Sequence, residues 1–167
     1  ITPIGLNVAD FWSGIKEGKI GFGEITRFDT TDYKCKLAAE VKDFDPTLYI
    51  EKREVRKMDL YCQYALAAAV QAVEDSGIVG NVDETRLGVY VGSGVGGIQT
   101  FYEQCNNMIN GKNISPFFIP MIIGNIASGN IAIRFKAKGP SLPVVTACAT
   151  STHAVGEAFH AIKAGYA

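Results

Sequence analysis

Cys148 is the residue best suited to chemistry, because it lies between a predicted strand and a predicted helix. The segment from Leu142 to Ala147 is apolar and β-branched, as in a buried strand, and residues 150–164 have the pattern of a helix. A helix N-terminus offers free N–H groups and partial positive charge, which stabilise a thiolate and can hold a developing oxyanion. Cys148 is therefore a candidate nucleophile, with a buried structural cysteine as the alternative.

Neither histidine of the chain is placed to act as a base for Cys148. His153 and His160 follow Cys148 by five and twelve residues. At about 100° per residue, both point away from the side of the helix that Cys148 occupies. We expect His153 to pack or to support the site indirectly, and His160 to be structural. The base would then lie outside these residues, as expected for half of an enzyme.

The other three cysteines, Cys35, Cys62 and Cys105, are expected to be buried and structural. No two of the four cysteines have CxxC spacing, which disfavours a metal site. A disulfide framework is also not expected in a chain of this size and apolar content. Reduced thiols indicate a cytoplasmic protein.

The segment Gly92–Gly97 matches the pattern G-x-G-x-x-G, between a predicted strand at residues 87–91 and a predicted helix at residues 98–110. A dinucleotide site also needs an acidic residue at the end of a second strand, about 20 positions further on. Phe117 stands there, and no such strand follows. We favour a tight turn whose backbone passes close to another segment, and keep a nucleotide-binding α/β module as the alternative.

Strands and helices alternate along the chain. Helices are predicted at residues 8–18, 55–76, 98–110, 120–134 and 150–164, and strands at residues 87–91 and 142–147, with a weaker strand signal at 36–41. Residues 19–50 are expected to be mostly extended or irregular. This order predicts an α/β fold with a mostly parallel sheet flanked by helices.

Composition excludes several classes of protein. The chain has 167 residues, with 16 Lys plus Arg against 17 Asp plus Glu, which argues against nucleic-acid binding. No apolar run reaches the roughly 20 residues that span a bilayer, so no membrane segment is expected. The chain begins at Ile1 without Met or a charged leader, and we expect it to be a piece of a longer protein.

Five ordered motifs resemble those of the β-ketoacyl-acyl-carrier-protein synthases, most of all the bacterial type II ketoacyl synthase II. They are the segments 1–5, 56–59, 92–97, 114–120 and 144–151, and Lys138–Ser141 fits as well. The resemblance implies a thiolase-like fold of two similar halves, of which residues 1–167 form a partial N-terminal domain. The first strand and the C-terminal half would be missing. That half would supply two catalytic histidines, a lysine and one oxyanion donor.

The resemblance also implies a function in fatty-acid elongation. Cys148 would accept an acyl chain as a thioester, and malonyl acyl carrier protein would then condense with it by decarboxylative Claisen chemistry. No cofactor or metal is implied. The partners would be acyl carrier protein, in its acyl and malonyl forms, and a second subunit in a homodimer. The 167 residues alone would be inactive. A polyketide ketoacyl synthase is an alternative, and a non-catalytic chain-length subunit is disfavoured by the presence of Cys148.

Further site residues follow from the resemblance one position at a time. Val95 would gate the acyl pocket, and Phe118 would reach the acyl pocket of the partner subunit. Four basic residues would dock the carrier protein: Arg53, Arg56, Lys57 and Lys112. Asn113 replaces the basic residue usual at its position, which suggests weaker docking.

Overall fold

A computed structural model describes all 167 residues, which divide into two compact units, Ile1–Asp45 and Pro46–Ala167. Each unit has its own internal contacts. No helix in either unit combines the length and the apolar character needed to cross a membrane.

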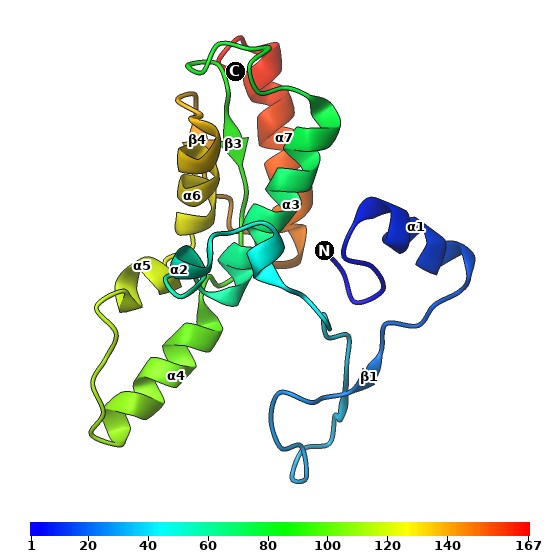
Figure 1. Cartoon of the computed structure of the whole chain (residues 1–167), viewed down its shortest axis with the longest axis vertical. Coiled ribbons are helices and arrows are strands. Elements are labelled where there is room, and N and C mark those ends of the chain that lie inside the picture. Colours follow the sequence, from blue (N-terminus) through cyan, green and yellow to red (C-terminus); the bar gives the residue numbers. More distant parts are fainter. The chain divides into compact units, whose positions relative to one another are not determined.

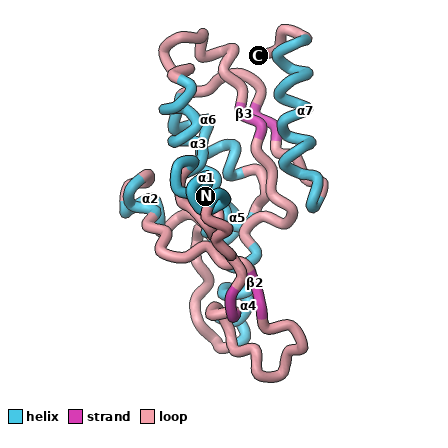
Figure 2. The backbone as a smooth tube through the Cα atoms, turned by 90° about the vertical axis from the view of Figure 1, so that its right-hand side faces the viewer, coloured by secondary structure: helices cyan, strands magenta, loops and turns pink.

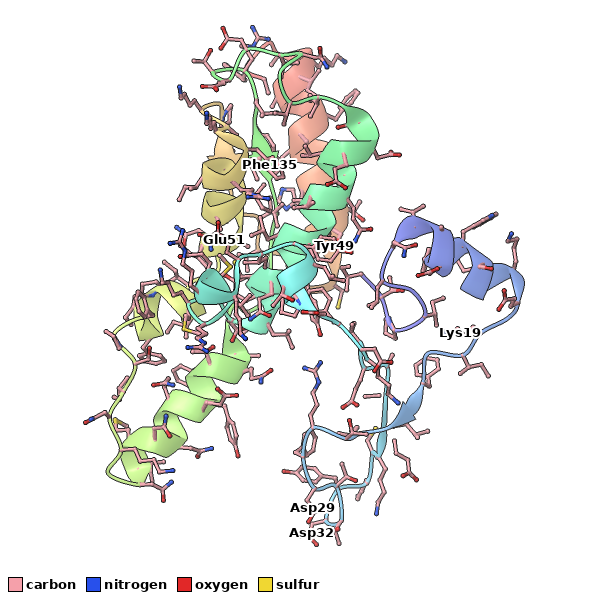
Figure 3. The ribbon with its side chains drawn as sticks, viewed as in Figure 1. Lys19, Asp29, Asp32, Tyr49, Glu51 and Phe135 are labelled. Carbon is pink, nitrogen blue, oxygen red and sulfur yellow. The ribbon has the colours of Figure 1, made fainter.

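The first unit is small and mostly irregular. Helix α1 (Val8–Lys16) begins at Asn7, whose side chain accepts a hydrogen bond from the backbone N–H of Asp10. Strands β1 (Gly23–Glu24) and β2 (Leu37–Ala38) pair antiparallel. Asp29 and Asp32 lie at the tip of the long loop between them (Figure 3). The predicted first helix is confirmed, as is the irregular character of residues 19–50.

The second unit contains the predicted alternation of strands and helices (Figure 1). Strands β3 and β4 pair parallel, with Val89 opposite Ser141 and Tyr90 opposite Leu142. Strand β3 lies between α6 and α7 (Figure 2). The elements in chain order are the 3₁₀ turn η1 (Pro46–Leu48), α2 (Lys52–Val55), α3 (Leu60–Ser76), β3 (Val89–Tyr90), α4 (Ile98–Ile109), α5 (Phe118–Ile122), α6 (Ile126–Phe135), β4 (Ser141–Leu142), the 3₁₀ turn η2 (Ala147–Ala149) and α7 (Thr150–Lys163).

The core of this unit forms where α3 and α6 pack against each other and α6 packs against β3. Its buried centre consists of Ile50, Leu66, Val89 and Ile131. Small buried side chains, Ala67 on α3 and Ala127 and Ser128 on α6, let the two helices approach closely. The sequence-based expectation that α3 packs through small residues is therefore confirmed.

The two predicted strands are shorter than expected. Only two residue pairs of β3 and β4 exchange ladder hydrogen bonds, so residues 143–147 are not part of a strand. Val144 is buried, whereas Leu142 and Val145 are exposed. The prediction of a wholly buried strand from 142 to 147 is thus wrong, because the chain leaves the ladder after Leu142.

Two predicted helices are each divided in the structure. The expected helix at residues 55–76 is interrupted before Asp59, which has extended backbone angles (φ −64°, ψ 156°) and begins α3 as its N-cap. The expected helix at 120–134 is interrupted at Ile123, which is also extended (φ −68°, ψ 135°). The Tyr61 hydroxyl donates to the Ile123 carbonyl oxygen at 2.6 Å, and burial raises the pKa of this hydroxyl above its usual range.

The Asp59 carboxylate joins two helix N-termini. One oxygen accepts from the backbone N–H of Tyr61 at 3.1 Å, and the other accepts from the backbone N–H of Thr100, on α4, at 2.8 Å. Asp59 is only 5% exposed. Because buried N–H groups need acceptors and helix N-termini favour negative charge, this carboxylate fastens α3 to α4.

We expect Asp59→Ala to lower the free energy of unfolding by about 2 kcal/mol, because each lost N-cap costs about 1 kcal/mol. Urea denaturation of the full-length protein measures the change. Asp83→Ala is the matched control, since Asp83 also accepts two hydrogen bonds, both from Thr85, but on the surface. Equal losses in the two variants would contradict the bridging role of Asp59.

Candidate functional site: the Cys148 turn

Cys148 lies at the centre of a 3₁₀ turn, Ala147–Ala149, that leads directly into α7. Its side chain is exposed. The preceding residue, Ala147, has φ +48°, a left-handed conformation that a residue with a Cβ rarely adopts. Cys148 thus stands at a sharp bend before a helix. The predicted position at a helix start is confirmed, but an irregular segment, not a strand, precedes the bend.

The N-terminus of α7 has no side-chain cap at its Ala149 position. The N–H of Ala149 donates to Thr146 and that of Thr150 to Ala147. No hydrogen bond within the chain uses the N–H of Cys148. This N–H is therefore available to an oxygen atom next to the thiol.

Four polar residues lie around the turn, and of these only His153 was expected from the sequence to support the site indirectly. Thr150 accepts from the N–H of Thr146 at 3.0 Å, and the Thr146 hydroxyl lies 3.4 Å from Nδ1 of His153. Nε2 of His153 lies 3.3 Å from Glu157, one turn further along α7. Only the i,i+4 spacing of His153 and Glu157 is a signal in the sequence.

Exposure distinguishes Cys148 from Cys62 and Cys105 but not from Cys35. Cys62 is fully buried, and this burial raises the pKa of its thiol although Asn130 donates a hydrogen bond to the sulfur. Cys105 is half-buried. Cys35 is exposed in the loop of the first unit, so the predicted burial of Cys35 is wrong.

Among all 167 residues, no group of three or more His, Cys, Asp or Glu side chains could hold a metal ion.

The glycine turn at residues 92–97 packs directly against the Cys148 turn. A Cβ on Gly92 would overlap the Val144 carbonyl oxygen and the Thr150 methyl group, and one on Gly94 would lie 3.8 Å from Cα of Ala147. The backbones can approach this closely at Gly92 only because it has no side chain, whereas Gly94 has room for a methyl group. Val95, 71% exposed, therefore lies on a turn that touches the bend at Cys148.

The other end of the glycine turn packs against the C-terminal end of α5. Gly96 has φ +83°, and a Cβ there would overlap the Ile122 carbonyl oxygen. A Cβ on Gly97 would overlap the Met121 carbonyl oxygen, while its N–H donates to Ile122 at 3.1 Å. The favoured interpretation of this motif, a turn in close backbone contact, is confirmed.

The N-terminus of α4 is closed to a phosphate group. The Asp59 carboxylate already accepts from Thr100, and the N–H of Gly97 already donates to Ile122. A phosphate would have to displace a buried like charge. The geometry thus disfavours the nucleotide-binding alternative.

Two of the four predicted docking cations are paired within the chain. Arg53 lies 2.8 Å from Glu51 and 3.6 Å from Glu54, and Lys57 lies 2.9 Å from Glu54. Figure 3 shows Glu51 at the start of α2. Arg56 is exposed and forms no ion pair, so it is the free cation of this cluster.

The two remaining predicted site residues are Lys112, which follows α4, and Phe118, which is the first residue of α5. Lys112 follows the C-terminal end of α4, a helix of 12 residues and about 18 Å whose opposite end is the one bonded to Asp59, and is therefore separate from the α2 cluster. Phe118 is half-buried and its ring stacks on Phe101, with centroids 6.1 Å apart. The Lys57 ammonium lies 5.8 Å from the ring of Phe117. This contact links α2 to the start of α5.

We expect Gly97→Ala to destabilise the protein by about 3 kcal/mol, because the added methyl group would overlap backbone that cannot move aside. Gly94→Ala is the matched control and should change stability by less than about 0.5 kcal/mol, since its methyl group meets nothing closer than 3.8 Å. Thermal unfolding of the two variants measures the difference. Similar melting temperatures would contradict the close packing of Gly97.

The second unit and its bend before α7 belong to a known architecture, that of the thiolase-like ketosynthases. The ishigamide ketosynthase/chain length factor superimposes with a TM-score of 0.88 at 29% identity, over 99% of this chain and 42% of that one. A ketosynthase in complex with a type II polyketide acyl-carrier protein superimposes with a TM-score of 0.82 at 25% identity, over 100% of this chain and 45% of that one. The predicted thiolase-like fold is confirmed.

The sequence places the chain in one family of this class. Residues 1–167 match the family described as "Beta-ketoacyl synthase, N-terminal domain", so the chain belongs to the β-ketoacyl synthases. It is 43% identical to "3-oxoacyl-[acyl-carrier-protein] synthase 2" of Synechocystis sp. over 170 aligned residues. The chain spans 41% of the length of that relative.

Proposed function

We propose that this chain is the nucleophile-bearing part of a 3-oxoacyl-[acyl-carrier-protein] synthase of fatty-acid elongation. The observation that supports this most is the exposed thiol of Cys148 at a sharp bend before an uncapped helix. The partial positive charge of that helix end can stabilise negative charge that develops beside the sulfur during a reaction.

The proposed reaction has two stages. The Cys148 thiolate attacks the carbonyl carbon of an acyl thioester on acyl carrier protein, a new C–S bond forms, and the carrier thiol leaves. Malonyl carrier protein then loses CO₂, and the resulting carbanion attacks the acyl carbon on Cys148. The new C–C bond forms as the C–S bond breaks, which returns the Cys148 thiolate and releases 3-oxoacyl carrier protein.

The free N–H of Cys148 supports a second role for the same residue. Each stage passes through a tetrahedral intermediate with a negative oxygen, which donors fixed in position stabilise. The N–H of Cys148 has no acceptor in the chain and belongs to the residue that holds the acyl group. We propose it as one of the two oxyanion donors, with the second donor and the two histidines outside residues 1–167.

Val95 and Phe118 are proposed to line the acyl pocket. The glycine turn that holds Val95 touches the Cys148 turn at one end and the segment following α5 at the other. An acyl chain that leaves Cys148 along this turn would therefore meet Val95. The exposed ring of Phe117 beside Phe118 favours a homodimer in which Phe118 contacts the acyl pocket of the partner subunit.

Acyl carrier protein, in its acyl and malonyl forms, is the proposed partner at the α2 cluster of Arg53, Arg56 and Lys57, with Lys112 as a separate contact. The similar polyketide ketosynthase is itself described in complex with an acyl-carrier protein. That likeness keeps a polyketide ketoacyl synthase as the second candidate function, distinguished by the acyl chain it accepts. The four free thiols support a location in the reducing cytoplasm.

We expect Cys148→Ala to abolish condensation in the full-length protein, because no other residue would hold the acyl group. The rate of 3-oxoacyl carrier protein formation from acyl and malonyl carrier proteins measures this. Cys35→Ala is the matched control, since Cys35 is also exposed but lies in a loop. Retained condensation in Cys148→Ala would refute the proposed function.

We expect Arg56→Ala to weaken the affinity for acyl carrier protein about tenfold, or about 1.4 kcal/mol, and Arg53→Ala to weaken it less. Both variants lose one positive charge, but the charge of Arg53 is already paired with acidic neighbours. Titration of the full-length protein at low and high salt measures the difference, which should shrink as salt screens the charges. A larger effect of Arg53→Ala would contradict Arg56 as the free docking cation.

A further inference from the structure

The backbone before Cys148 is in a conformation that needs support from its surroundings. Ala147 has φ +48°, which is unfavourable for any residue with a Cβ. Such a conformation persists only where neighbouring contacts hold it. The direction in which Cys148 points depends on this residue, so the contacts on either side of Ala147 matter for the thiol.

Thr146, the residue before Ala147, is bonded to α7 through three of its atoms. Its N–H donates to the hydroxyl of Thr150 at 3.0 Å, and its carbonyl oxygen accepts from the N–H of Ala149 at 3.0 Å. Its hydroxyl lies 3.4 Å from Nδ1 of His153. The first two of these bonds stay within four residues, whereas the third reaches a second turn of the helix.

His153 is itself oriented by Glu157. Nε2 of His153 lies 3.3 Å from the Glu157 carboxylate, which can only accept a hydrogen bond, so Nε2 is the nitrogen that bears hydrogen. In the neutral ring Nδ1 is then free to accept from the Thr146 hydroxyl. The carboxylate therefore fixes both the ring position and the nitrogen that faces Thr146.

We propose that Thr146, His153 and Glu157 form a hydrogen-bonded chain that positions the Cys148 turn for acylation. This inference rests on the proposed function of Cys148. The three are positioning residues, since they act on the backbone beside Cys148 and not on the substrate. The His153 ring thus affects the thiol through Thr146.

The opposite side of the turn adds a reason why this chain is needed. The glycine turn packs against Val144, Ala147 and Thr150 through glycines, which have no side chain that could hold the bend. Hydrogen bonds from the bend therefore come from the α7 side alone, and only the Thr146 hydroxyl makes one through a side chain of the bend itself. Its loss would let the bend relax towards an ordinary φ.

The test is a double-mutant cycle of Thr146→Val and His153→Phe in the full-length protein, read out as the iodoacetamide alkylation rate of Cys148 and as acylation kinetics. We expect each single variant to lower the alkylation rate and the limiting acylation rate about tenfold with KM unchanged. The double variant should be no slower than either single variant, since both break one chain. Thr146→Ser, which keeps the hydroxyl, should restore the rate.

Three controls separate positioning from folding. Cys35 alkylation in the same sample should stay constant, and His160→Phe, on the same helix, should have the wild-type rate. Glu157→Ala removes the acceptor from a half-exposed position and should lower the Cys148 rate even if Thr146→Val fails to fold. Wild-type rates in His153→Phe and Glu157→Ala, or multiplicative effects in the double variant, would overturn the positioning role. Acyl transfer that persists in Cys148→Ala would instead refute the proposed function itself.

Discussion

The buried carboxylate of Asp59 is the contact on which the arrangement of the second unit depends. It accepts from the first turn of α3 and from the first turn of α4. The N–H of Gly97 and the hydroxyl of Tyr61 then bind the carbonyl oxygens of Ile122 and Ile123. Three helices and the glycine turn are thereby held together, and the glycine turn in turn limits the space beside Cys148.

The bends that lead into α4 and α7 differ in what occupies the helix N-terminus. At α4 the buried Asp59 carboxylate fills the position that an anion would take. At α7 there is no side-chain cap, the thiol of Cys148 is exposed, and its N–H is free. The partial positive charge of a helix N-terminus favours phosphate, carboxylate and thiolate alike. The group that already occupies the N-terminus therefore decides whether it is structural or free for chemistry. The first bend is structural, and the second is available for chemistry.

Much of this could be predicted from the sequence where the information is local. The helices, the parallel strand pair and the close-packed glycine turn follow from periodicity and glycine spacing. The N-cap role of Asp59 also has a sequence signal, because an Asp precedes the apolar run of α3. The sequence pattern nevertheless predicts a helix that begins at residue 55. The left-handed Ala147 and the Thr146–His153 contact were not predictable, because alanine disfavours that conformation and the contact exists only once the bend has formed.

The central claim is that the acyl group resides on Cys148. The most direct measurement is proteolytic peptide mapping by mass spectrometry, after the full-length protein has been incubated with acyl carrier protein bearing an acyl thioester. We expect the acyl mass on the peptide that contains Cys148, and none on the peptides of Cys35, Cys62 and Cys105, although Cys35 is also exposed. An acyl group on Cys35, or on any residue other than Cys148, would contradict the assignment.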